Sequence, residues 1–278
     1  MHFSKYHGLG NDYLVYEADS APYPLTAKQV EKICHRHYGF GADGILVGSE
    51  TGNPEAPFAL TIYNPDGSTA EKSGNGLRIF ARYLYDNEKV NEEPFCLETK
   101  GGRVQCQILD HGSTVRVGMG DIDFSSAAIP VTGPEREVLG EPVEIEDTWY
   151  SIYAVSVGNP HCVLPMETLS KELACEIGPI LETHPLFPQR TNVQFLKILD
   201  KKNLQIEIWE RGAGYTLASG SSSCAAAAVA RKMGIIKDAA TVHMPGGTLE
   251  IEFDDDHVTL TGPVCYVGKL EMDEEALI

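Results

Sequence analysis

Two short stretches of the chain share one pattern, and their repetition constrains the fold more than any other feature. Residues 73–81 read SGNGLRIFA and residues 219–227 read SGSSSCAAA. A Ser-Gly pair followed by small or polar residues and an apolar run is typical of a helix start, where the serine caps the helix and backbone N–H groups receive an anion. Ser73 and Ser219 lie 146 residues apart in a chain of 278. This spacing predicts a duplicated fold.

Further landmarks recur in the same order, at offsets of 143 to 148 residues. They are Gly10-Asn11 and Gly158-Asn159, Asn64 and Glu210, Gly101-Gly102 and Gly246-Gly247, and residues 115–117 and 258–260. Such self-similarity predicts an α/β (α+β) protein of two pseudo-symmetric domains. We expect each domain to be a curved, mostly antiparallel sheet around a central helix, with the active site in the cleft between them. The expected domains are residues 1–120 with a C-terminal strand at about 265–278, and residues 121–264.

Hydrophobic spacing and capping residues predict four helices. They cover residues 26–37, 74–85, 166–177 and 220–233. The two helices that follow the Ser-Gly pairs are the expected central helices.

The charge balance argues against nucleic acid as a partner. The chain carries 22 basic and 40 acidic residues, for a net charge of −18, whereas phosphate binding needs clustered Lys and Arg. No apolar run reaches the length of about 20 residues that a membrane span needs. The seven cysteines show no CxxC spacing, which is typical of a reduced, cytoplasmic protein. We expect no metal site and no cofactor.

Several motifs together resemble the diaminopimelate epimerase family over nearly the whole chain. They are HGLGND at 7–12, GFGADG at 39–44, NPDGS at 64–68, GNGLR at 74–78, GNPH at 158–161, FPQRTN at 187–192, WERG at 209–212 and TLA at 216–218. The resemblance implies a cofactor-independent isomerase of lysine biosynthesis, with a small amino acid as substrate and a homodimer as its assembly. In this family one cysteine thiolate removes the α-proton, and a second thiol on the opposite face returns one.

Both catalytic cysteine positions of the family hold serine here, at Ser73 and Ser219. A thiol has a pKa of about 8.5, which falls to about 3.5–7.5 at a helix start. An alcohol is closer to water, at about 15.7. The gap of roughly seven pKa units corresponds to about 10 kcal/mol, whereas a helix start contributes at most about 2 kcal/mol. Neither serine therefore acts as the same base unaided.

The resemblance also assigns the substrate-binding positions. A distal amine needs a carboxylate, a distal carboxylate needs an arginine, and asparagines supply neutral hydrogen bonds. These positions are Asn11, Asn64, Asn159, Asn192, Glu210 and Arg211, with Gly74, Asn75, Gly220 and Ser221 offering N–H groups to the α-carboxylate. Lys72 and His161 are accessory candidates, since a desolvated lysine acts as a base; a solvated Lys72 and a structural His161 are the alternative interpretations.

Four hypotheses follow from a retained recognition set and an altered catalytic pair. The first is an isomerase that inverts the α-carbon of diaminopimelate or a similar amino acid. The second is another proton shift, such as double-bond isomerisation or dehydration. The third is a non-catalytic amino-acid binder. The fourth is a variant in which serines have replaced the cysteines to trap substrate.

Overall fold

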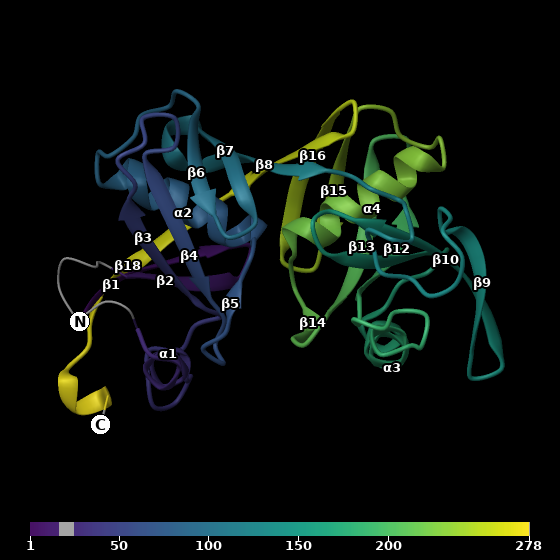
Figure 1. The fold of residues 1–278 in the computed structure, drawn as a ribbon, viewed down its shortest axis with the longest axis horizontal. Helices are drawn as coiled ribbons and strands as arrows, with labels where there is room; N and C mark the ends of the chain where they lie inside the picture. Colours follow the sequence, from purple (N-terminus) through teal and green to yellow (C-terminus); the bar gives the residue numbers. More distant parts are fainter. Residues whose placement is uncertain (17–24, 278) are drawn as a thin grey trace. The chain divides into compact units, whose positions relative to one another are not determined.

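The computed structural model describes residues 1–16 and 25–277, and its chain divides into two compact units (Figure 1). Unit 1 comprises Met1–Gly118 and Thr261–Ile278, and unit 2 comprises Met119–Leu260. The chain leaves unit 1 within strand β8 (Thr114–Asp121) and returns within β17 (His257–Pro263). Unit 2 is therefore one continuous segment, whereas unit 1 needs both ends of the chain.

Unit 1 is a mixed sheet around helix α2. Its elements are β1 (His2–Gly8), β2 (Asn11–Tyr16), α1 (Ala27–Cys34), β3 (Ile45–Glu50), β4 (Phe58–Tyr63), β5 (Thr69–Ala70), α2 (Gly74–Asp86), β6 (Phe95–Thr99), β7 (Gly102–Leu109), the 3-10 turn η2 (Asp110–Gly112), β18 (Cys265–Glu271) and η3 (Glu274–Leu277). Strands pair antiparallel in β1–β2, β3–β4, β6–β7, β7–β8 and β1–β18, and parallel in β2–β3 and β4–β6. Helix α2 contacts β1, β2, β3 and β7.

Unit 2 repeats this order around helix α4. Its elements are β9 (Leu139–Ile145), β10 (Thr148–Ser156), β11 (Pro160–Pro165), α3 (Lys171–Glu182), β12 (Asn192–Ile198), β13 (Asn203–Glu210), β14 (Gly214–Thr216), α4 (Gly220–Lys232), β15 (Ala239–Met244) and β16 (Gly247–Asp254). Strands pair antiparallel in β10–β11, β12–β13, β13–β14 and β15–β16, and parallel in β11–β12 and β13–β15. Each unit thus alternates antiparallel and parallel pairs in one sequence, and the predicted fold class is confirmed.

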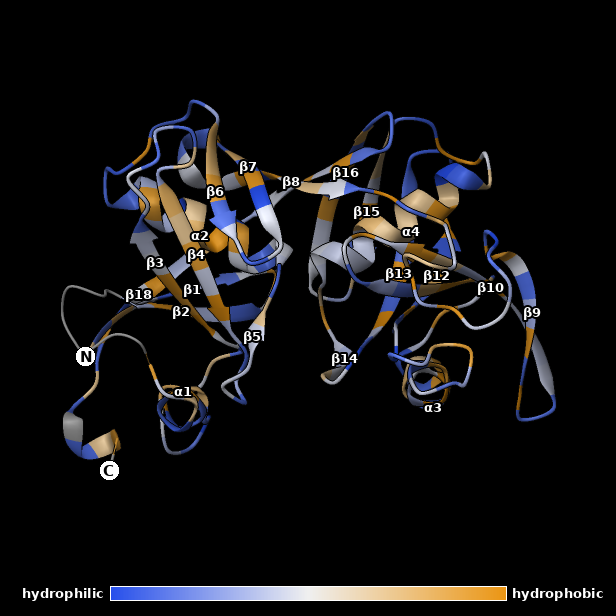
Figure 2. Ribbon diagram, viewed as in Figure 1, coloured by the Kyte–Doolittle hydropathy of each residue, from blue (hydrophilic) through white to orange (hydrophobic). Residues whose placement is uncertain are grey.

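The two central helices are buried because most of the side chains that they turn toward the sheet are apolar or small, with Arg78 as a buried exception in α2. Helix α4 is rich in alanine, and residues 222–230 are all buried. Helix α2 approaches β3 so closely that a Cβ at Gly48 would lie 2.3 Å from the ring of Phe80. Figure 2 shows the alanine-rich part of α4 in the hydrophobic colours, whereas α2 mixes hydrophobic and hydrophilic colours. Burial on several sides is what allows these helix starts to be fixed rigidly.

Two helix predictions were wrong in their bounds. The helix expected over 166–177 is α3, Lys171–Glu182, because the side chain of Ser170 caps it by accepting the Leu173 N–H. The helix expected over 26–37 ends at Cys34, because His35 has extended backbone. Its start was predicted correctly, since Thr26 and Gln29 form a capping box.

Candidate active site

The starts of α2 and α4 have the same local geometry. Ser73 has φ −142° and ψ 117°, and Ser219 has φ −146° and ψ 126°. The Ser73 hydroxyl accepts the Gly76 N–H at 3.1 Å, and the Ser219 hydroxyl accepts the Ser222 N–H at 3.4 Å. Each serine therefore satisfies the third N–H of its helix, and each hydroxyl lies at the positive end of a helix dipole.

The described neighbours of the Ser73 hydroxyl and of the Ser219 backbone are neutral groups. The Tyr13 hydroxyl lies 3.3 Å from that of Ser73. Ser219 is buried, its N–H donates to the Met244 sulfur at 3.4 Å, and its carbonyl accepts the Ser223 hydroxyl at 2.8 Å. Helix N–H groups stabilise an oxyanion at either serine, but a neutral hydroxyl neighbour does not remove the serine proton.

A buried arginine organises the start of α2. Arg78 is fully buried and donates to the Asn75 side-chain oxygen at 2.8 Å and to the Gly74 carbonyl at 3.2 Å. The Asn75 amide in turn donates to the Asn11 side-chain oxygen at 2.9 Å. Unit 1 thus brings Asn11, Asn75 and Gly74 together at the helix that Ser73 caps, and the network fixes which way each amide points.

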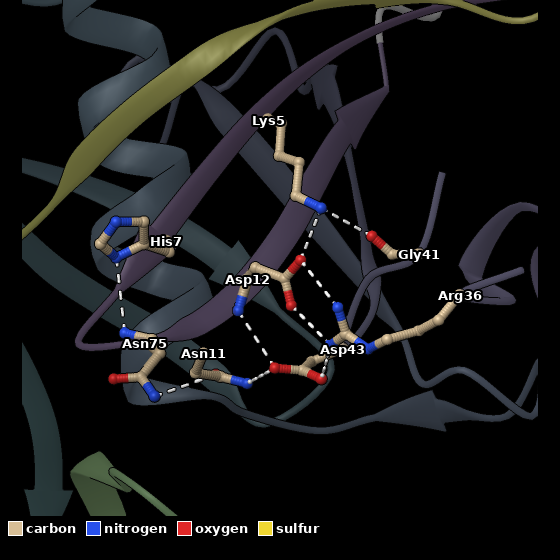
Figure 3. A network of polar contacts seen from close by, with 9 residues as sticks. Lys5, His7, Asn11, Asp12, Arg36, Gly41, Asp43 and Asn75 are labelled. Atoms are coloured by element: carbon tan, nitrogen blue, oxygen red, sulfur yellow. Dashed lines mark hydrogen bonds and ion pairs between the residues drawn. The ribbon is translucent and has the colours of Figure 1, made fainter. Parts of the chain in front are cut away.

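An ionic network holds the other side of Asn11 (Figure 3). The Asn11 amide donates to Asp43 at 2.9 Å, and Arg36 bridges Asp43 at 2.7 Å and Asp12 at 2.8 Å. Lys5 lies 2.7 Å from Asp12. Burial raises the pKa of Asp12, but hydrogen bonds from Arg36 and Lys5 outweigh it, so the net pKa is lowered. Asp12 therefore stays ionised at neutral pH.

Asn64 and Lys72 lie on the segments that precede α2. The Asn64 amide donates to the Ser68 hydroxyl at 3.0 Å, and its N–H donates to the Ser68 carbonyl at 2.8 Å. Asn64 therefore closes the turn between β4 and β5. Lys72 is half-buried immediately before the Ser73 cap.

His161 is a neutral, fully buried histidine beside Asn159. Burial lowers the pKa of His161 to about 3, with the side chain of Gln194 opposing and the charge of Arg211 assisting. Its Nε2 lies 2.9 Å from the Asn159 side-chain oxygen. At neutral pH the Nε2–H form donates to Asn159. Gln194 also reaches the start of α4, because its amide donates to the Ser222 hydroxyl at 3.0 Å.

Asn192 joins two segments of unit 2 through its side chain. Its amide donates to the Pro160 carbonyl at 2.9 Å, and its oxygen accepts the Arg211 N–H at 3.0 Å. The Arg211 guanidinium donates to the Gln189 carbonyl at 3.2 Å. Glu210 is the last residue of β13, and Arg211 follows it. The hydrogen bond from the Arg211 N–H to Asn192 holds this end of the strand in place.

Unit 2 therefore brings together Asn159, His161, Asn192 and Arg211, while Gln194 connects β12 to the helix that begins with Gly220 and Ser221. Sequence reasoning missed the residues that hold the others in place, namely Tyr13, Asp43, Arg78 and Gln194. Asp43 could have been singled out, since it lies inside the Gly39–Gly44 motif.

Within residues 1–16 and 25–277, His, Cys, Asp and Glu side chains form no group of three that could hold a metal ion. Across the same described residues, every helix is too short or too polar to span a bilayer.

Solved structures of low sequence identity define the class of this fold. A hydroxyproline epimerase from Agrobacterium vitis, with bound trans-4-hydroxy-L-proline, matches with a TM-score of 0.74 at 15% identity, covering 99% of this chain and 93% of that chain. A probable proline racemase from Agrobacterium radiobacter K84 matches with a TM-score of 0.73 at 16% identity, covering 99% and 95%. The fold is thus the two-domain fold of epimerases and racemases.

The sequence comparisons identify the family within this class. The family model for diaminopimelate epimerase matches residues 3–125 and 153–267. The chain is 52% identical over 276 residues to "Diaminopimelate epimerase 2" of Nostoc sp. strain PCC 7120, covering 99% of this chain and 96% of the relative. The chain belongs to the diaminopimelate epimerase family, a family of isomerases, as its motifs predicted.

Proposed function

We propose that this chain is an isomerase that acts on diaminopimelate or a close analogue, with Ser73 and Ser219 at the two proton-transfer positions. One observation carries the proposal. The two serines cap equivalent helices of the two repeats with the same backbone geometry and the same bond to the third N–H. Inversion at a carbon needs a base on one face and an acid on the other, and a pair of matched groups suits that requirement. That both act on one substrate molecule stays a prediction.

The recognition residues support an amino-acid substrate with a second charged end. Asn11, Asn75 and Gly74 share one network at the start of α2, and Asn159, Asn192 and Arg211 share another in unit 2. In the proposed complex, helix N–H groups take the α-carboxylate, and Glu210 with Arg211 takes the distal amine and carboxylate.

The hydroxyls limit the rate of this reaction. A serine hydroxyl gives up its proton near neutral pH far less readily than a thiol, by roughly seven pKa units. We therefore expect substrate binding to be intact and turnover of the present chain to be slow.

The test is the double variant Ser73→Cys/Ser219→Cys, assayed under reducing conditions for chiral product from LL-diaminopimelate and for α-deuterium uptake in heavy water. We expect epimerase activity to rise by orders of magnitude, because thiols at helix starts ionise near neutral pH. Each single variant is the matched control and should gain much less. A folded, ligand-binding double variant without inversion would overturn the proposal in favour of a different proton shift.

We also propose a homodimer in the cytoplasm. The exposed Tyr266 and Val267 on β18 support self-association, and the seven free thiols suit a reducing compartment. Light scattering of the purified protein decides the assembly, and a monomeric mass would exclude the dimer.

A further inference from the structure

Glu182 is a buried carboxylate in an unfavourable place. It is 4% exposed and lies in the last turn of α3, where the negative end of the helix dipole disfavours an acidic side chain. A buried carboxylate needs hydrogen-bond donors, and Glu182 has three. The Trp209 indole N–H donates at 2.7 Å, the Gly212 backbone N–H donates at 2.7 Å, and the Arg190 guanidinium forms an ion pair.

These donors surround the proposed recognition pair. Trp209 and Gly212 immediately flank Glu210 and Arg211, so one carboxylate fastens both sides of the pair. Arg190 directly follows Gln189, whose carbonyl accepts the Arg211 guanidinium at 3.2 Å. The same side chain thus holds the strand end, the turn after it and the loop that orients the arginine.

The helix that carries Glu182 is shaped for this contact. Gly178 lies one helical turn before Glu182 on the same face. A Cβ at Gly178 would lie 2.6 Å from the Trp209 Cβ, so glycine lets the tryptophan approach α3 closely. The indole then reaches the carboxylate one turn further along.

We propose that Glu182 is a positioning residue that sets the placement of Glu210 and Arg211, and thereby selects ligands with a distal carboxylate. This inference rests on the proposed function for the role of the pair, and it assigns Glu182 no contact with substrate. A carboxylate at a helix C-terminus is destabilising. The three donors that offset this for Glu182 all belong to segments around Glu210 and Arg211.

The test compares Glu182→Gln with Glu176→Gln. Glutamine keeps the shape of Glu182 but has one acceptor oxygen, so the N–H of Trp209 or Gly212 loses its partner. Glu176 is exposed on the same helix, so the control removes the same charge. If Glu182→Gln fails to fold, Trp209→Phe becomes the test variant, because it removes only the hydrogen bond from the indole N–H to Glu182.

Two readouts decide the proposal. Amide hydrogen exchange at Arg211 and Gly212 should become about tenfold faster in Glu182→Gln, and calorimetry should show LL-diaminopimelate bound about tenfold more weakly. Binding of L-norleucine, which has neither the distal amine nor the distal carboxylate, should be unchanged, as should every property of Glu176→Gln. Unchanged exchange, or equal weakening of both ligands, would overturn the role of Glu182. A wild-type protein that binds no diaminopimelate would overturn the proposed function, while the exchange result would still decide the placement of the pair.

Discussion

The asparagine amides at the candidate site are oriented by hydrogen-bond partners within the protein. Asn75 donates to the oxygen of Asn11, and His161 lies within hydrogen-bond distance of the oxygen of Asn159. Asn192 uses both ends of its amide, toward Pro160 and Arg211. Fixing the oxygen decides which group of the amide faces a ligand, so recognition depends on residues that do not touch the ligand themselves.

We expect Arg211 to set the affinity for the distal carboxylate. Replacing Arg211 with alanine removes a charge-assisted contact, and we expect binding of diaminopimelate to weaken by about 1.5–3 kcal/mol. Calorimetry measures the change. Arg103→Ala is the control, because Arg103 pairs with Glu55 on the surface of unit 1. Equal affinities of the Arg211 variant and the wild type would remove Arg211 from the site.

His161 makes stability depend on pH. Its folded pKa of about 3 is below the unfolded value of about 6.5. The unfolded chain therefore takes up a proton first, so stability is fully present above pH 6.5 and is lost as the pH falls toward 3. Between pH 7.5 and pH 5 we expect His161 to lower the free energy of unfolding by about 2 kcal/mol.

Urea unfolding at the two pH values measures this loss, with His161→Gln as the reference. The difference between the two proteins isolates His161 from the other histidines. A pH dependence that is the same in both would show that folding does not lower the pKa of His161.

At the scale of elements, the close contact between α3 and β13 depends on Gly178. Alanine there gains helix propensity of about 1 kcal/mol, but its Cβ would meet Trp209 at 2.6 Å and force the strand end to shift. Overpacking costs about 1–3 kcal/mol, so we expect Gly178→Ala to lower the melting temperature and to weaken diaminopimelate binding.

Gly268→Ala is the matched control for this prediction, since a Cβ at Gly268 meets nothing within 4 Å. Thermal unfolding followed by circular dichroism compares the two variants. If Gly178→Ala were as stable as Gly268→Ala, the end of β13 would be able to shift away from the added methyl group without a loss of stability.

Sequence patterns predicted the helix starts better than the contacts between elements. Ser73, Ser219 and Thr26 cap their helices as expected, because capping is local and leaves a local signature. The start of α3 at Ser170 was missed, since apolar spacing before it imitates a helix. Asp43 and Glu182 act through partners on other elements, and no spacing rule reveals such pairings. Arg78 bonds to Gly74 and Asn75 within its own helix, but its burial depends on the sheet around that helix.

At the scale of the whole molecule, the repeated order of landmarks predicted the repeated order of strand pairs. Each unit has an antiparallel pair, a parallel pair, an antiparallel pair and a parallel pair around one helix. Most of the strand pairs in the two units are antiparallel, as expected. The places of the parallel pairs were not predicted, because alternating polarity marks a strand but does not give its direction. The serine substitutions, by contrast, are visible in the sequence alone.

Unit 2 should fold without unit 1. Residues 119–260 are continuous and contain their own hydrophobic core, including Ile152, Phe195 and Leu181. We expect this fragment to unfold cooperatively, as followed by circular dichroism. Residues 1–118 alone lack the β18 partner of β1 and serve as the comparison. A fragment 119–260 without a cooperative transition would show that its core needs the rest of the chain.

The pairing of β1 with β18 also determines when, during translation, the sheet of unit 1 can be completed. The ribosome makes β1 first and β18 last, with all of unit 2 between them. One edge of β1 therefore has no strand partner throughout translation of the second repeat. Open strand edges invite association with other chains, so a nascent chain of this protein is exposed to aggregation at β1 for as long as its second repeat is being made.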